Sequence, residues 1–258
     1  MLSLVEIQIH IAKHCNLNCY SCNNFSSVAD EEYPNIKEVE ADLARLAFLT
    51  KGEINNIQLC GGEPLLNKDI IEYFKIIRHY FSNSAIDIVT NGILLKKMPE
   101  SFWQACSDYD VTFDPSIYPI KIDWDWFKNK CNSYGIKYHL TMDKSEFCKL
   151  QMDEQGLRNP YYMFNLCFKA NHCVTLEKGV LYTCPEACEI KTFNKKFGTH
   201  FPENNGIDIY KAKNLHEILE FLATPIRFCG YCAEPLRTPI KWKRTTRMKE
   251  EWIRCDIR

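Results

Sequence analysis

The feature that most constrains the fold is a regular alternation of strand-like and helix-like segments over residues 1–145. The expected strands are Leu4–Ala12, Ile54–Gly62, Ala85–Asn91, Tyr109–Asp114 and Lys137–Thr141, and the expected helices are Lys37–Leu49, a helix capped by Asn67, Glu100–Ser107 and Trp124–Ser133. Repeated β-α units favour a parallel sheet. We therefore expect an α/β fold built on a partial parallel barrel of the (β/α)6 type.

The expected strands carry their polar side chains on one face. Ile7, Ile9 and Ile11 alternate with Gln8 and His10. The same split recurs in later strands, with polar or small residues at Gln58, Cys60, Thr112, Asp114, His139 and Thr141. A filled barrel has branched apolar side chains inside. Here the apolar face is free to pack on helices, which predicts an open, polar-lined ligand cavity; the alternative is edge strands with one wet face.

The β-α rhythm stops near residue 150, so we expect three units: residues 1–150, a cysteine-rich unit over 151–236, and a basic tail over 237–258. Val174–Cys184 resembles a hairpin turning at Lys178–Gly179, and Leu215–Ala223 a short helix. The tail holds eight basic and three acidic residues. It is either a solvated face or a lid that attracts a phosphate or carboxylate group of a substrate.

Charge and hydropathy limit the class of protein. The net charge is −1, which argues against a general nucleic-acid binder. The N-terminus lacks the pattern of a signal peptide, and no apolar stretch reaches the length of a membrane span, so we expect a cytoplasmic protein without a membrane partner. In a reducing compartment, 14 cysteines point to metal or redox chemistry rather than disulfides.

Three cysteines follow the first strand in the pattern C-x3-C-x2-C: Cys15, Cys19 and Cys22. A 4Fe–4S cluster normally takes four thiolates, so a cluster held by three leaves one iron open to another ligand. A zinc ion would want a fourth ligand nearby, and His14 is adjacent to Cys15 rather than suitably spaced. The spacing favours iron–sulfur, with zinc as the alternative.

Two further motifs end the next strands: Gly61-Gly62-Glu63-Pro64 and Thr90-Asn91-Gly92. The glycines permit close backbone approach to a ligand. Glu63 offers a carboxylate to an ammonium group at the end of the strand where parallel barrels carry their sites. In this order on successive strands, the three motifs resemble the radical S-adenosylmethionine (radical SAM) superfamily over roughly residues 5–145.

This resemblance implies a specific chemistry. Cys15, Cys19 and Cys22 would hold the 4Fe–4S cluster, whose open iron would chelate S-adenosylmethionine. Gly61, Gly62 and Glu63, with Asn91 from the next motif, would bind the cofactor. Reductive cleavage of S-adenosylmethionine would then give a 5′-deoxyadenosyl radical that abstracts hydrogen from the substrate.

The sequence departs from the family at one position. The family usually has an aromatic residue just before the third cysteine, near the adenine. Here that residue is Ser21, preceded by Tyr20. We expect Tyr20 or Phe25 to take over the adenine contact.

A second cysteine set lies in the later half. Cys167, Cys184, Cys229 and Cys232 resemble the twitch-type auxiliary domain, a shortened form of the SPASM domain of radical SAM enzymes. Four thiolates would fully ligate a second, auxiliary 4Fe–4S cluster, and four sulfurs suit zinc equally well. Cys173 and Cys188 are close enough in sequence to replace a member of the set, and only Cys255 follows it.

The candidate substrate-contacting residues are Cys60, His10, Asp114 and His139, each of which is otherwise a packed core residue. The function favoured is oxidation of a small polar substrate, a sugar or cyclitol, through the auxiliary cluster. An epimerase would instead return hydrogen from a thiol such as Cys60, Cys173 or Cys188. An electron donor such as flavodoxin or ferredoxin is the expected partner.

Two other classes remain open. A peptide-modifying maturase would act on a short peptide, although the sequence leaves no room for a leader-binding domain before the first strand. A zinc-stabilised binding protein would explain the cysteines but not the GGEP motif.

Overall fold

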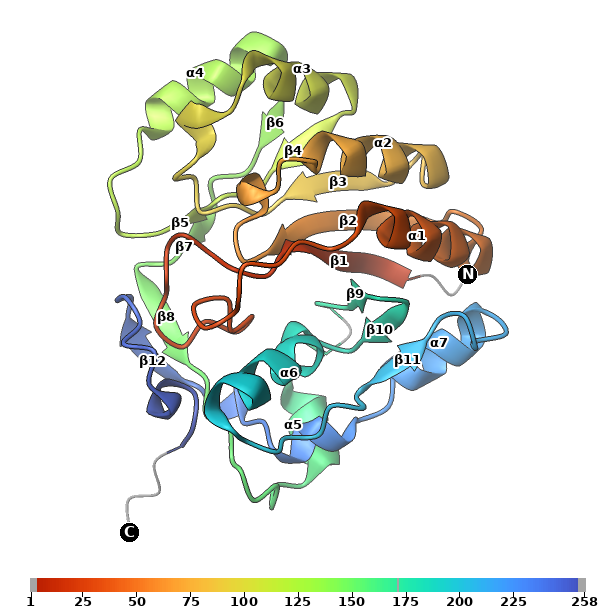
Figure 1. Ribbon diagram of the computed structural model, residues 1–258, viewed down its shortest axis with the longest axis vertical. Coiled ribbons are helices and arrows are strands. Elements are labelled where there is room, and N and C mark those ends of the chain that lie inside the picture. The colour runs from red at the N-terminus through yellow and green to blue at the C-terminus, as the bar shows by residue number, and fades with distance from the viewer. Residues whose placement is uncertain (1–3, 171, 255–258) are drawn as a thin grey trace.

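The computed structural model describes residues 4–170 and 172–254, which fold around an eight-stranded sheet of order β11-β10-β9-β1-β2-β3-β4-β6 (Figure 1). Six adjacent strands of this sheet are parallel: β9 (Thr175–Glu177), β1 (Leu4–Ala12), β2 (Ile54–Gly61), β3 (Ala85–Ile88), β4 (Val111–Phe113) and β6 (Lys137–Tyr138). Two antiparallel strands, β10 (Val180–Tyr182) and β11 (Gly206–Asp208), extend one edge. The expected α/β fold with a partial parallel barrel is confirmed, and its sixth parallel strand comes from beyond residue 150.

Four helices connect the parallel strands and lie side by side along one face of the sheet (Figure 1). They are α1 (Ile36–Thr50), α2 (Ile70–Tyr80), α3 (Glu100–Asp108) and α4 (Trp124–Tyr134). Ile7, Ile9 and Ile11 of β1 are buried in the core shared with these helices. This confirms the direction of the predicted apolar face, since burial of apolar side chains is the main force that holds helix to sheet.

The opposite face of the sheet is polar, as the alternation predicted. The side chain of Asn56 donates hydrogen bonds to Glu6 (3.0 Å) and Asp87 (2.8 Å). Gln8 donates to Gln58 (3.1 Å) across β1 and β2. These bonds run from strand to strand and satisfy polar groups that would otherwise be costly to bury.

Residues at or next to most helix ends explain why the helices begin and end there. Asn35 accepts a hydrogen bond from the backbone of Lys37 and caps α1, and Gly135 ends α4 in the left-handed region. The predicted cap at Asn67 is wrong. Asn67 accepts from the backbone of Asp69 (2.9 Å) and donates to the carbonyl of Ile11 (2.7 Å), so it ties the turn to β1 and α2 begins only at Ile70.

The later half contains a hairpin and three helices. The predicted hairpin is formed by β9 and β10, with Lys178 and Gly179 both at positive φ in its turn. Asp42 of α1 accepts a hydrogen bond from the backbone of Gly179 (2.7 Å) and fixes the turn against the sheet. The helices are α5 (Pro160–Leu166), α6 (Pro185–Phe197) and α7 (Leu215–Leu222).

Two small strand pairs and several 3-10 turns complete the described chain. The pairs are β5 (Ser116–Ile117) with β7 (Met142–Asp143) and β8 (Glu146–Lys149) with β12 (Thr238–Lys241). The 3-10 turns are Pro64–Leu66, Leu95–Lys97, Arg227–Gly230, Glu234–Leu236 and Lys249–Glu251.

The predicted unit boundaries near residues 150 and 236 are crossed by backbone pairing. β9 pairs with β1, and β12 pairs with β8. The last four residues of the predicted tail, Cys255 among them, lie outside the described residues. Among the helices that the structure describes, none is long and apolar enough to cross a membrane.

Candidate active site

One cavity of about 260 Å³ collects the three motifs that the sequence singles out. Cys15, Cys19 and Cys22, from the loop after β1, line it together with Gly61 and Gly62 at the end of β2. Asn91, which follows β3, also lines it. The carboxyl ends of neighbouring parallel strands meet at one edge of a sheet, which is why motifs far apart in sequence converge here.

Little nearby charge offsets the effect of burial on the three thiols. Burial raises the pKa of Cys15 and of Cys19 to about 12, and it raises the pKa of Cys22 as well. The sulfur of Cys15 lies 3.4 Å from the backbone nitrogen of Leu17, and that of Cys19 lies 3.2 Å from the indole nitrogen of Trp242. Buried thiols surrounded by N–H donors fit thiolates that bind a positively charged metal group.

The two glycines are required by the loop that carries the cysteines. A Cβ atom on Gly62 would lie 1.9 Å from the carbonyl oxygen of His14, and one on Gly61 would lie 2.6 Å from that of Ala12. Gly61 also has a φ of +115°. The close approach seen here is therefore between β2 and the cysteine loop, and it brings both glycines into the cavity wall.

Glu63 is completely buried behind this wall. Its carboxylate accepts hydrogen bonds from the hydroxyl of Thr90 (2.6 Å) and the backbone of Asn91 (2.9 Å). Burial raises the pKa of Glu63 to about 7, although these bonds oppose the rise. Glu63 joins the ends of β2 and β3 and is not among the residues that line the cavity; its contact with an ammonium group stays a prediction.

The residues considered for the adenine contact lie apart from the cavity wall. The ring of Tyr20 packs under the ammonium group of Lys243, 4.2 Å from its nitrogen. Phe25 is fully buried against Phe193 and Trp252 in a second core, and its contact with adenine stays a prediction. The aromatic residues that line the cavity are Tyr118 and Phe147, which sequence reasoning missed.

The second cysteine set also gathers at one place. Cys167, Cys184, Cys229 and Cys232 line a single small pocket, mostly apolar, between α5, α6 and the turn at Arg227–Gly230. Burial raises the pKa of all four thiols above the usual value. Cys173 lines the larger cavity instead, and Cys188 contacts Glu177, so neither lies among the four.

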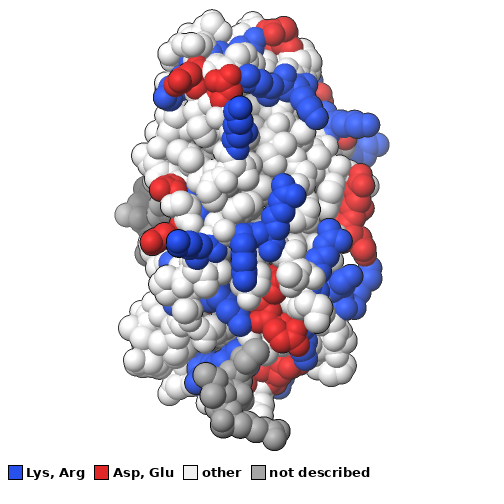
Figure 2. Space-filling model, turned by 90° about the vertical axis from the view of Figure 1, so that its left-hand side faces the viewer, with Lys and Arg blue, Asp and Glu red and all other residues white. Residues whose placement is uncertain are grey.

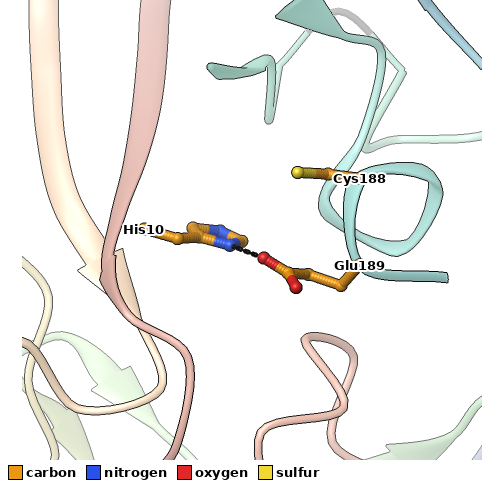
Figure 3. A group of neighbouring side chains, drawn as sticks. All are labelled: His10, Cys188 and Glu189. Carbon is orange, nitrogen blue, oxygen red and sulfur yellow. Dashed lines mark hydrogen bonds and ion pairs between the residues drawn. The ribbon is translucent and has the colours of Figure 1, made fainter. Parts of the chain in front are cut away.

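Of the four residues predicted to contact substrate, the structure places one in the cavity wall and three outside it. Cys60 lines the cavity, whereas His10, Asp114 and His139 do not. His10 points from β1 toward Glu189 of α6, with 2.7 Å between Nδ1 and Oε1 (Figure 3). Burial disfavours the charged imidazole, but Cys60 and Glu189 outweigh it and raise the pKa of His10 to about 10. The catalytic role of all four stays a prediction.

His10, Cys188 and Glu189 bring three potential ligand atoms within 4.8 Å of one another (Figure 3). The ammonium group of Lys13 lies 2.6 Å from the same Glu189 oxygen and 2.5 Å from Glu177. A cation already occupies the shared carboxylate, so this group is a buried ion-pair network rather than a metal site.

Three residues at the site carry no local sequence signal. Lys144 and Lys169 line the cavity, and Trp242 contacts Cys19 from the segment after β12. Lys169 is buried, contacts Glu186 and lies 3.1 Å from an oxygen of Glu234. Because Glu186 and Glu234 both line the four-cysteine pocket, Lys169 joins the two cysteine sites.

Comparison with known proteins agrees with this site. Residues 9–114 match the model of the Radical SAM superfamily. A probable GTP 3',8-cyclase of Pyrococcus abyssi is 31% identical over 105 residues, which is 41% of this chain and 33% of that protein. The FeMo cofactor biosynthesis protein NifB of Methanocaldococcus jannaschii is 26% identical over 210 residues, 73% of this chain and 64% of that one.

The chain spans about a third of the length of the GTP 3',8-cyclase relatives that it matches. Among solved structures, BtrN in complex with AdoMet and 2-DOIA has a TM-score of 0.55 at 17% identity, covering 90% of this chain and 93% of that chain. This likeness concerns the fold. With the matched residues spanning the cysteine loop and the ends of β2 and β3, the chain carries a radical SAM domain over residues 9–114.

Proposed function

We propose that this protein oxidises a small polar substrate, a sugar or cyclitol, by radical SAM chemistry with an auxiliary iron–sulfur cluster as electron acceptor. The observation that carries the proposal is that two separate cysteine sets gather, each at its own pocket, on either side of Lys169. When bound, a three-thiolate 4Fe–4S cluster with one open iron supplies the electron that cleaves S-adenosylmethionine, and the resulting radical removes a substrate hydrogen.

Residues of the chain then have distinct tasks. Cys15, Cys19 and Cys22 hold the first cluster, and the backbone of Gly61 and Gly62 forms the adjoining wall. Gln8 and Gln58 line the cavity with amide groups, which suit the hydroxyl groups of a sugar or cyclitol. Oxidation of a carbinol carbon removes one hydrogen atom, one proton and one electron, and an iron–sulfur cluster held by the second cysteine set would receive that electron.

The spacing of the thiols supports clusters over single zinc ions. Sulfur ligands of one tetrahedral zinc lie about 3.8 Å apart, given Zn–S bonds of about 2.3 Å. Among the described residues, only His10, Cys188 and Glu189 bring three potential ligand atoms within 4.8 Å of one another. Neither cysteine set converges to the spacing of a single ion, whereas a four-iron cluster holds its thiolates farther apart.

A second candidate function is epimerisation. Cys60 and Cys173 both line the cavity, and either thiol would supply the hydrogen atom that an epimerase returns to its substrate. This function needs no electron acceptor, so it does not require the four-cysteine pocket to hold iron. A flavodoxin or ferredoxin would serve as the electron donor in both cases.

The decisive test is iron and sulfide content after anaerobic reconstitution. We expect about eight irons per chain in the wild type and about four in a Cys15→Ala, Cys19→Ala, Cys22→Ala variant. The matched variant with Ala at 167, 184, 229 and 232 should also retain about four and still cleave S-adenosylmethionine. Four irons in the wild type that vanish in the first variant would remove the acceptor and favour epimerisation; zinc in both sites would overturn the proposal.

A further inference from the structure

The charges that line the cavity have one sign. Among the described residues of its wall, the side chains that carry a full charge are Lys144 and Lys169, and no carboxylate lines it. The other polar groups are amides and hydroxyls, including those of Gln8, Gln58 and Tyr118. A cavity with two ammonium groups and no acidic side chain favours a negatively charged occupant over a neutral one.

The two lysines are not equivalent. The charge of Lys169 is balanced by two carboxylates, because Glu186 contacts its ammonium group and an oxygen of Glu234 lies 3.1 Å from its nitrogen. Both carboxylates belong to the wall of the four-cysteine pocket. Lys169 therefore has a structural role between the two cysteine sites, and Glu186 and Glu234 largely balance its positive charge.

Among the described residues, Lys144 has no such partner. In the part of the chain that the structure describes, no carboxylate forms an ion pair with its ammonium group. Burial lowers the pKa of Lys144, and the like charges of Arg237 and Lys169 lower it further, while Asp114 opposes them. A half-buried ammonium group among other cations is unfavourable in the empty protein, and an anion beside it removes that cost.

The surface around this part of the molecule would guide an anion inward. Lys144 lies just before β8, and β8 pairs with β12 of the basic C-terminal segment. Figure 2 shows lysine and arginine side chains gathered over the middle of the face that carries these two strands. Clusters of one charge raise the local concentration of oppositely charged ligands.

We propose that Lys144 is the recognition point for an anionic group, a phosphate or a carboxylate, on the substrate of this cavity. The proposal rests on the proposed function only in placing the substrate in the cavity. It narrows the substrate from a neutral sugar or cyclitol to one that carries an acidic group, such as a sugar phosphate or a sugar acid.

The test uses the reconstituted protein saturated with S-adenosylmethionine, and it measures the binding of inorganic pyrophosphate and of malonate by calorimetry. We expect one probe to bind the wild type, and the affinity to fall about tenfold in Lys144→Met, because a hydrogen bond to a charged group is lost. Lys144→Arg, which keeps the charge, should retain most of the affinity. Lys241→Met removes an exposed charge from β12 and should change affinity less than twofold.

Preference for pyrophosphate assigns a phosphate, and preference for malonate assigns a carboxylate. The inference is overturned if neither probe binds, or if Lys241→Met weakens binding as much as Lys144→Met, which would indicate the surface field alone. It is also overturned if the probes bind only without S-adenosylmethionine, because Lys144 would then serve the methionine carboxylate. Iron content and cleavage of S-adenosylmethionine, measured on the same samples, report failure of the proposed function separately.

Discussion

The indole nitrogen of Trp242 lies 3.2 Å from the sulfur of Cys19 and donates its hydrogen to it, although 223 residues separate the two in the chain. The ring of Trp242 also packs on Tyr118, with ring centroids 5.9 Å apart. Hydrogen bonds to thiolate ligands stabilise the more negative, reduced state of an iron–sulfur cluster. Trp242 is thus placed to set the reduction potential at the cysteine loop.

Replacing Trp242 by phenylalanine should lower that potential. Loss of a hydrogen bond worth about 1 kcal/mol corresponds to a decrease of about 40 mV for a one-electron couple. The measurement is a redox titration of the reconstituted cluster followed by electron paramagnetic resonance. Trp126→Phe, on α4, makes the same chemical change away from the site and should leave the potential unchanged; an equal shift in both variants would contradict the assignment.

Replacing Gly62 by alanine should prevent normal loading of the first cluster. The new methyl carbon would lie 1.9 Å from the carbonyl oxygen of His14, so the cysteine loop would have to move. We expect the iron content to fall by about half, as in the triple cysteine variant. Gly135→Ala is the control, since Gly135 has positive φ but its added carbon meets nothing within 4 Å, so the substitution strains the backbone without displacing a neighbour. That variant should lose about 1 kcal/mol of stability and keep its iron.

Replacing Lys169 by methionine should strongly destabilise the protein. The substitution leaves Glu186 and Glu234 buried without their shared cation, which costs about 3–5 kcal/mol. Urea unfolding measures the loss, and an added Glu186→Gln substitution should restore part of it. Lys75→Met breaks an exposed pair with Glu72 and should change stability little. Equal effects of the two lysine substitutions would show that the Lys169 network contributes little.

The contacts of His10 with Cys60 and Glu189 should make stability depend on alkaline pH. The pKa of His10 rises in the folded protein from the usual 6.5 to about 10, so the folded state binds the proton more tightly than the unfolded state. This contribution is complete below pH 6.5 and is lost as the pH rises through about 10. Urea unfolding at several alkaline pH values should show a steeper loss for the wild type than for His10→Gln. His216→Gln, at an exposed position of α7, should behave like the wild type.

The sequence predicted the fold because its information is local. The alternation in β1 decides which face packs on helices, and the order of the three motifs places them at the same edge of a parallel sheet. The turn at Lys178–Gly179 was also predictable, since it lies between two short apolar runs. The helix cap predicted at Asn67 was wrong because an asparagine three residues before a helix serves equally well in a turn, where its side chain accepts a hydrogen bond from a nearby backbone N–H.

The rest depends on contacts between distant segments. His10 was predicted to face the substrate, but its partner Glu189 lies 179 residues away on α6, and no local pattern indicates that pairing. Strand periodicity also predicts on which face of the sheet a side chain lies, but not whether that part of the face lines the cavity. Asp114 and His139 therefore share the polar face and yet lie outside the cavity wall. Lys144 and Trp242 come from irregular segments in which lysine and tryptophan have no expected position.

The pairing of the cysteine loop with the C-terminal segment has a consequence for biosynthesis. The backbone of Tyr20 donates to Lys243, that of Thr245 donates to Asn18, and the indole of Trp252 donates to the carbonyl of Cys22. A ribosome makes the three cysteines early but the residues that hold their loop in place more than 200 positions later. The loop therefore reaches the shape described here only after residues 242–252 have been translated.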